Sequence, residues 1–370
     1  MANVTRYRAT PPPPPPRRPA RLRIFMPTLG LLLVMGGVAV VWAVLSWRAG
    51  QEMDAWLQRE ADLGRTWSCP DRGIAGFPFR IEVTCTDATF TGMSEGRALK
   101  GKVARVHSVA QIYNPGHVIV EVDSPLVVEA AGGDRLEVDW LLGRASILGK
   151  PGAGLDRFSA ELTEPRLTLT NARVGTITVT AGVADFHIRR TPNSPAEDGA
   201  YDVASRITRA TIPPLDALLG SASPAEADFV TTITRAEPLA GRGLPTELER
   251  WRVAGGRMQV TKAMVSHGPR RLDAFGTVGL DDARRPQGRL DVTVSGLDDL
   301  LARFGLSGRS SAIGGLIAGV LGGRPGGAQA AEAPAQGAPP GPKGVVLPLR
   351  MDGGRVFLGP IPVATLLPLF

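Results

Sequence analysis

Residues 117–122 read HVIVEV, and similar short runs follow at 126–130 (LVVEA), 166–170 (RLTLT) and 176–180 (TITVT). Several of these runs alternate apolar residues with Thr, Glu or Asp. Alternation with a period of two is typical of a sheet with one dry and one wet face. Gly and Pro pairs separate the runs, with no long helical segment between them. The sequence therefore predicts a mainly β fold with a large antiparallel sheet.

The alternation also assigns side chains to faces of this sheet. Val118, Val120 and Val122 share one side of their strand, and Ile177 and Val179 share one side of theirs. That side is either a closed core or an apolar groove open to a ligand. These five residues are the candidate groove.

Three stretches have a strand-like run followed by a short apolar turn. Residues 207–220 contain LDALL at 215–219, residues 290–305 contain LDDLL at 297–301, and residues 356–370 contain VATLL at 363–367. Loose repetition of this kind indicates short helices that cap a sheet. Whether the three share an origin stays open.

Composition divides the rest of this region. We expect residues 48–307 to form the mainly β domain. Residues 308–344 are rich in Gly, Ala and Pro, and such a segment buries too little apolar surface to offset its ordering entropy. We expect a flexible excursion there, and a C-terminal strand within 345–370 that returns to the sheet.

Residues 25–47 (FMPTLGLLLVMGGVAVVWAVLSW) carry no charge. As a helix they would reach about 34 Å, enough to cross a hydrocarbon layer of about 30 Å. Trp42 and Trp47 lie near the end of this run, as is common at a membrane–water interface. The spacing of apolar residues at 48–66 predicts that the helix continues beyond the membrane. The sequence thus predicts a single transmembrane helix that acts as a signal anchor.

The flanks of this helix predict its orientation. Residues 1–24 form an arm with six arginines, no acid and a run of prolines at 11–16, whereas residues 48–66 mix both charges. The positive-inside rule places such an arm in the cytoplasm and the rest of the chain outside it. The alternative is a cleaved signal peptide, which is disfavoured by the length of the apolar run and by the absence of an Ala-x-Ala site.

The net charge of +7 does not indicate a nucleic-acid partner. The arm supplies six of these charges, so the remaining chain carries only +1. A nearly neutral domain lacks the basic surface that a phosphate backbone requires. The arm is better suited to anionic lipid headgroups of the bilayer.

Cys69 and Cys85 are the only cysteines in the chain. Outside the cytoplasm a lone pair usually forms a disulfide. Their spacing matches neither a Cys-x-x-Cys redox motif nor a zinc site. We expect a structural disulfide.

Between these cysteines lies the sequence GFPFR at 76–80, and Trp67 comes just before the first one. Together with the preceding membrane helix and the ending DGGRVFLGPIPVATLLPLF at 352–370, these residues resemble domain-of-unknown-function family 2125, a group of bacterial envelope proteins. Trp67, Gly76, Phe77, Pro78, Phe79 and Arg80 are the residues that carry the resemblance. It implies no activity, and its general texture is similar to AsmA-like and YdgA-like envelope proteins, which are thought to handle lipids or outer-membrane assembly.

Residues with catalytic potential are few. Ser94 lies in GMSEG, which matches the nucleophile elbow Gly-x-Ser-x-Gly, but the elbow needs a helix after the serine and strand-like residues resume at 103. The four histidines are far apart in sequence and predict no metal site. We expect no cofactor and no enzymatic activity.

These observations lead to one main functional hypothesis and two alternatives. The main one is a bacterial inner-membrane protein with its bulk in the periplasm, which maintains the envelope by binding or handling lipid, or an outer-membrane component, on an apolar sheet face. The first alternative is a structural or scaffolding protein that binds another envelope protein. The second, less favoured, is a hydrolase centred on Ser94.

Overall fold

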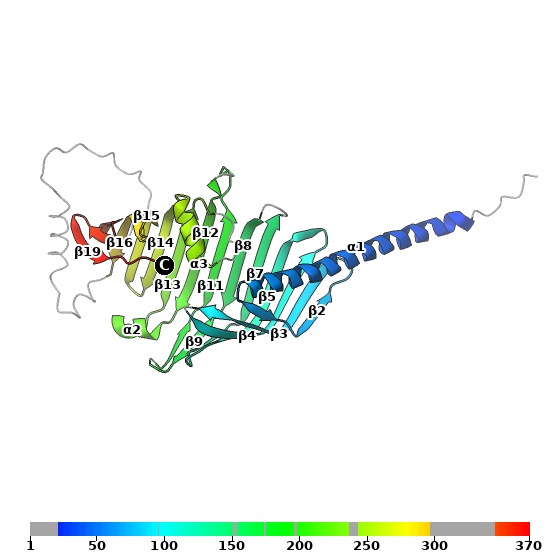
Figure 1. Cartoon of the computed structure of the whole chain (residues 1–370), viewed down its shortest axis with the longest axis horizontal. Coiled ribbons are helices and arrows are strands. Elements are labelled where there is room, and N and C mark those ends of the chain that lie inside the picture. The colour runs from blue at the N-terminus through cyan, green and yellow to red at the C-terminus, as the bar shows by residue number, and fades with distance from the viewer. Residues whose placement is uncertain are drawn as a thin grey trace, which may run out of the picture.

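The computed structural model describes residues 21–94, 96–150, 154–173, 175–195, 198–236, 243–296 and 345–370. The first described element is one long helix, α1 (Arg21–Asp62), which includes the predicted membrane span and its predicted continuation as far as Asp62. Its most apolar stretch has a mean hydropathy of 2.4 and is not buried by the rest of the protein, so the helix is long and apolar enough to cross a membrane. Figure 1 shows α1 projecting from one end of an elongated sheet.

The described residues after α1 are mainly strands, as the alternation predicted. The first ten strands are β1 (Thr66–Ser68), β2 (Asp71–Ala75), β3 (Arg80–Ser94), β4 (Arg97–Gln111), β5 (Asn114–Ala130), β6 (Arg135–Asp139), β7 (Leu142–Lys150), β8 (Gly154–Thr163), β9 (Arg166–Asn171) and β10 (Gly175–Thr180). The remaining nine are β11 (Val183–Arg190), β12 (Tyr201–Ala210), β13 (Ala225–Ile233), β14 (Met258–His267), β15 (Arg270–Leu280), β16 (Pro286–Ser295), β17 (Val345–Asp352), β18 (Arg355–Leu358) and β19 (Ile361–Thr365). Two short helices, α2 (Pro213–Leu219) and α3 (Leu244–Val253), interrupt them.

All of these strands belong to one antiparallel sheet, which forks at β5. The first half of β5 pairs with β7 and its second half pairs with β6. From β7 the main sheet continues through β8 and β11–β18 to β19, while from β6 a short branch continues through β9 to β10. Only Glu164 and Pro165 separate β8 of the main sheet from β9 of the branch, so a two-residue connection joins the two arms of the fork.

Helix α1 is fastened to the first strands by polar and aromatic contacts. Asp54 pairs with Arg72 of β2, and the indole Nε1 of Trp67 donates to Glu60 at 3.3 Å. The Trp67 ring lies between Trp56 of α1 and Phe90 of β3, with ring centroids 5.6 and 5.0 Å away. These contacts fix the direction of the helix relative to the sheet.

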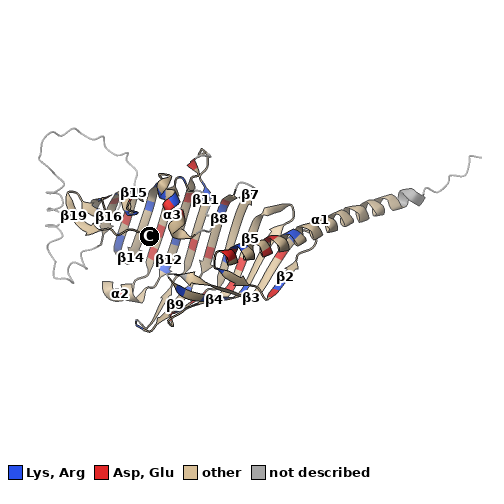
Figure 2. Ribbon diagram, in the orientation of Figure 1, with Lys and Arg blue, Asp and Glu red and all other residues tan. Residues whose placement is uncertain are grey.

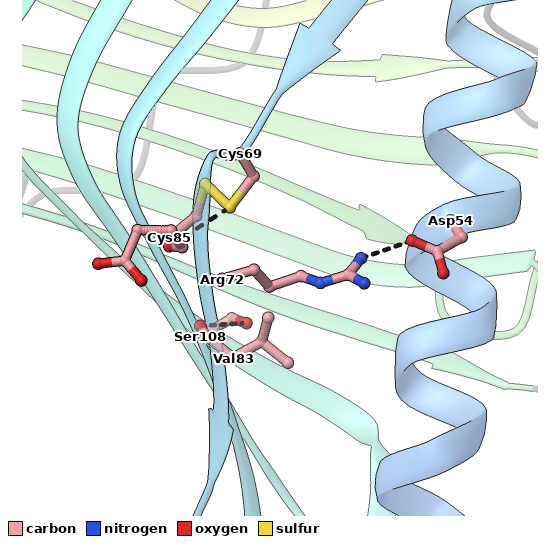
Figure 3. The surroundings of a disulfide bond; sticks show 7 residues. Asp54, Cys69, Arg72, Val83, Cys85 and Ser108 are labelled. Atoms are coloured by element: carbon pink, nitrogen blue, oxygen red, sulfur yellow. Dashed lines mark hydrogen bonds and ion pairs between the residues drawn. A yellow bond between two sulfur atoms is a disulfide. The ribbon is translucent and has the colours of Figure 1, made fainter.

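The predicted disulfide is present beside this junction. Cys69 is bonded to Cys85 of β3, and Figure 3 shows the bond next to the Arg72–Asp54 ion pair that reaches α1. The bond therefore clasps the segment between β1 and β2 to the long strand β3. A loop of this length contributes roughly 3 kcal/mol to stability in the chain-entropy model.

The predicted short helices are confirmed in one of three places. Helix α2 covers 215–219, but 363–367 overlaps β19 instead of forming a helical turn, because residues 361–365 pair with β18. The third stretch, 297–301, and the expected excursion at 308–344 lie outside the described residues. After residue 344 the chain forms β17, which pairs with β16.

Candidate apolar binding face

One row of apolar side chains crosses the main sheet from β3 to β18. Residues directly opposite each other in an antiparallel ladder project from the same face. The registers give the row Ile81, Ala110, Val118, Ile147, Phe158, Ile188, Val203, Thr231, Val260, Gly276, Leu290, Leu349 and Leu358. Thr231 is its one polar member, and its hydroxyl donates to the carbonyl oxygen of Gln259 at 2.9 Å.

Two further rows run parallel to the first on the same face. The second includes Val83, Val120, Phe186 and Val292, and the third includes Val106, Val122, Ile207, Val265 and Leu272. None of the three rows contains a charged residue over its length. We refer to these three rows as the apolar face.

The opposite face carries the charges of the sheet. Glu121, Arg144 and Glu161 are consecutive across β5, β7 and β8, with an Arg144–Glu161 ion pair of 3.0 Å. Further along, Asp228 on β13 pairs with Lys262 on β14 at 2.6 Å. Figure 2 shows positive and negative residues distributed along the strands of the sheet. Cross-strand ion pairs of this kind suit a surface in contact with water.

The apolar face is only partly covered. Ile81, Val203 and Val260 of its first row are buried, whereas Phe186, Ile207 and Leu272 are more than one third exposed and Val265 is 49% exposed. Val118, Val120 and Val122 are half-buried. A closed core would bury large apolar residues in all rows. The third row therefore lies along an open part of this face.

The fork extends the apolar face onto the branch. Val128 of β5 lies opposite Leu136 of β6, which lies opposite Leu169 of β9, which in turn lies opposite Ile177 of β10. Leu126, Val138, Leu167 and Val179 form the adjacent row in the same order. The candidate groove residues on β5 and β10 thus lie on one continuous surface, although 55 or more residues separate them in sequence.

Helix α3 covers one margin of the apolar face and encloses a cavity of about 430 Å³. The sheet supplies Ile233, Met258 and Val278, the helix supplies Leu248 and Trp251, and the C-terminal tail supplies Leu369. The indole Nε1 of Trp251 donates to the carbonyl oxygen of Thr234 at 2.8 Å, which fixes the helix over β13. Figure 1 accordingly places the C-terminus close to α3.

Helix α2 lies at the opposite margin, beside the branch. Its Asp216 is 2.8 Å from Nε2 of the buried His267 on β14. Thr211, just before the helix, forms a bridge with Thr180 of β10. The open third row is therefore bounded by α2 and the branch at one margin, with α3 at the other.

The residues of the GFPFR motif lie at the other end of the sheet. Gly76, Phe77, Pro78 and Phe79 form the turn between β2 and β3, where Gly76 has φ = 100° and a Cβ would meet the backbone of Arg80. Arg80 forms an ion pair with Glu82, in line with a structural role for its side chain. Trp67 is the ring between α1 and Phe90 described above.

Ser94 is the last residue of β3 and lies opposite Arg97, the first residue of β4. The serine of the GMSEG motif is therefore the last residue of a strand, and another strand begins at Arg97, where the elbow needs a helix. Among the described residues, no three His, Cys, Asp or Glu side chains are grouped so as to hold a metal ion.

Residues 42–366 of the chain match the family described as "Uncharacterized protein conserved in bacteria (DUF2125)". The chain belongs to the DUF2125 family. The DUF2125 match begins at Trp42, within the apolar part of α1, and ends one residue after β19, so it includes the whole apolar face. No match was found among curated proteins or among solved structures. The looser likeness to AsmA-like and YdgA-like proteins stays an expectation.

Sequence reasoning missed helix α3 and the cavity beneath it in this DUF2125 chain. The available signal was the helical spacing of Leu244, Leu248 and Trp251, which places all three on one side of a helix. The contribution of Leu369 had no local signal, because it depends on the tail crossing to the turn between β15 and β16.

Proposed function

We propose that this protein is anchored in the bacterial inner membrane with its sheet in the periplasm, and that it handles lipid on the apolar face without catalysing a reaction. The observation that carries the proposal is the set of three rows without a charged residue, of which the third is open. Such a contiguous exposed apolar surface marks a binding site for an apolar ligand. An acyl chain has the length and chemistry to lie along such a row.

The cavity under α3 supports the same proposal. Its volume falls in the range of about 300–1,000 Å³ typical of small-molecule sites. Its lining combines apolar side chains with Arg235, Glu247 and Arg250. Apolar walls with a few charged groups suit an amphiphile whose tail is buried and whose headgroup is polar.

Photo-crosslinking tests this function. A benzophenone amino acid replaces Val265 on the apolar face or, as the matched control, Ser266, its neighbour on the opposite face of β14. Irradiation of cells followed by mass spectrometry should give a lipid adduct at position 265 and none at 266. Equal lipid labelling at both positions, or none at either, would contradict the proposal.

The scaffolding alternative rests on a different observation. All five residues of β19 are exposed, and among the described residues this strand pairs only with β18. A free sheet edge can accept a strand from another protein. A protein adduct at Val265, or adducts only from positions on β19, would favour this alternative over lipid handling.

A further inference from the structure

The turn at residues 76–79 lies against the apolar part of α1, not against its polar continuation. The indole Nε1 of Trp42 donates to the carbonyl oxygen of Arg80 at 2.8 Å. The ring of Phe77 meets the Trp42 ring edge-on, with centroids 5.5 Å apart. The turn therefore lies at the same depth in the bilayer as Trp42.

The length of the apolar run sets the depth of Trp42. At 1.5 Å per residue, Trp42 is about 26 Å along the helix from Phe25, and a hydrocarbon layer of about 30 Å ends a few residues later. The first charge after the run is Arg48. Trp42 thus lies near the outer boundary of the hydrocarbon, where indole rings are enriched.

The side chains around this turn are aromatic and unusually exposed. Phe77 is 57% exposed and Phe79 62%. Tyr113, in the adjacent turn between β4 and β5, is 72% exposed, and the amide nitrogen of Ile112 donates to the carbonyl oxygen of Phe79 at 3.0 Å. Three large rings turned outward are unfavourable in water and favourable at a lipid interface.

We propose that Phe77, Phe79 and Tyr113 insert into the interfacial layer of the lipid bilayer that α1 crosses. We refer to these three residues as the aromatic cluster. The aromatic cluster holds the end of the sheet that carries these two turns on the membrane surface. This inference rests on the proposed anchoring of the protein by α1 and is independent of lipid handling. Together with lipid handling, this insertion would make the apolar face begin at the bilayer, because Ile81 and Ala110 of the first row are each two residues from one of these turns.

Depth measurements test the insertion with the full chain in nanodiscs of phosphatidylcholine and phosphatidylglycerol. Because both native cysteines are in a disulfide, a nitroxide can be attached to one introduced cysteine, at Phe79→Cys, Tyr113→Cys or the control Leu141→Cys, whose native side chain is 74% exposed between β6 and β7. Labels at 79 and 113 should collide several-fold more often with lipid-soluble oxygen than with a water-soluble nickel chelate. The label at 141 should show the reverse. Matching behaviour at all three positions would overturn the proposal.

A second measurement needs no substitution. Hydroxyl-radical footprinting of the wild-type protein in the same nanodiscs should oxidise Phe79 and Tyr113 several-fold more slowly than Phe275, an exposed ring on the charged face of the sheet. Equal oxidation of these rings would place the cluster in water. Neither outcome bears on whether lipid binds at Val265, so failure of the two proposals can be distinguished.

Discussion

Glu249 on α3 forms an ion pair with Arg284 in the turn between β15 and β16, with Nε and Oε2 3.2 Å apart. The Phe370 ring lies against the same guanidinium, 5.2 Å from its carbon, and the amide nitrogen of Leu369 donates to the carbonyl oxygen of Arg284 at 3.1 Å. Arg284 therefore joins the cavity's helix to the C-terminal tail that forms another of its walls.

Acid should loosen α3. The hydrogen bond from Arg252, supported by that from Arg284, holds the pKa of the Glu249 carboxyl below its ordinary value of 4.5. A lowered pKa in the folded state means that the stabilisation is fully present above about pH 4.5 and is lost as the pH falls through the lowered pKa. Hydrogen exchange of the α3 amides, corrected for intrinsic rates, should show protection falling in that window.

The matched variant for this prediction is Glu249→Gln. It should show weaker protection of α3 at neutral pH and a smaller change on acidification, because the titrating group is gone. If acidification lowers the amide protection of α3 equally in the variant and the wild type, other carboxyl groups cause the effect.

A charge on the apolar face should have opposite effects at two positions. Val203→Asp places a carboxylate at a buried site and should cost several kcal/mol of unfolding free energy. Val265→Asp places it in the open third row and should lower Tm only slightly, while abolishing lipid labelling by a benzophenone amino acid at Leu272, the residue opposite Val265 in the same row. Ser266→Asp, facing Arg271 on the charged side, is the control that should leave both quantities unchanged. Thermal melts and lipid labelling of all three variants are the measurements. If stability and lipid labelling fall in proportion to each other in the variants, the third row is part of a closed core.

Removal of the disulfide should destabilise the protein by roughly 3 kcal/mol in the chain-entropy model. Replacing both Cys69 and Cys85 by Ser should therefore lower Tm by several degrees, and reductant should lower the wild-type Tm to a similar value. Reductant should leave the double variant unaffected. A mass of the unreduced protein that corresponds to two free thiols would contradict the Cys69–Cys85 disulfide.

Gly101 on β4 allows the Phe90 ring to lie across the strand. A Cβ at this position would collide with the edge of that ring, so Gly101→Ala should cost about 1–3 kcal/mol by overpacking. Gly73 on β2 has nothing within 4 Å of an added Cβ and is the matched control. Chemical denaturation of both variants is the measurement. Phe90→Leu should partly relieve Gly101→Ala, whereas equal costs at 101 and 73 would show that the ring is not the cause.

The proposed orientation predicts the location of the C-terminus. A reporter that is active only in the periplasm, fused after Phe370, should be active, because in this orientation α1 would cross the membrane once with residues 1–24 in the cytoplasm. A reporter active only in the cytoplasm should be silent at the same position, and the reverse pair of results would invert the topology.

The fold class could be predicted from local patterns, because the alternation of apolar and polar residues lies within each strand. Val118, Val120 and Val122 lie in the three adjacent rows of the apolar face. Helix α1 includes the predicted span but ends at Asp62, short of the predicted residue 66, because β1 begins at Thr66. The fork at β5 could not be predicted, since the two halves of this strand are alike in composition and their partners are chosen by long-range packing. The apolar turn predicted at 363–367 was wrong for the same reason, because residues 361–365 form β19. Its apolar residues fit either period, and pairing with β18 decided between them.

The first row crosses 13 strands of the main sheet, from Ile81 to Leu358. At about 4.8 Å between neighbouring strands it measures about 58 Å along the sheet, nearly twice the thickness of a hydrocarbon layer of about 30 Å. Every hairpin added to such a sheet lengthens it by about 10 Å and leaves the chemistry of its surface unchanged. The length of the sheet is thus set by its number of strands. Insertion or deletion of a hairpin can change this length independently of what the surface binds.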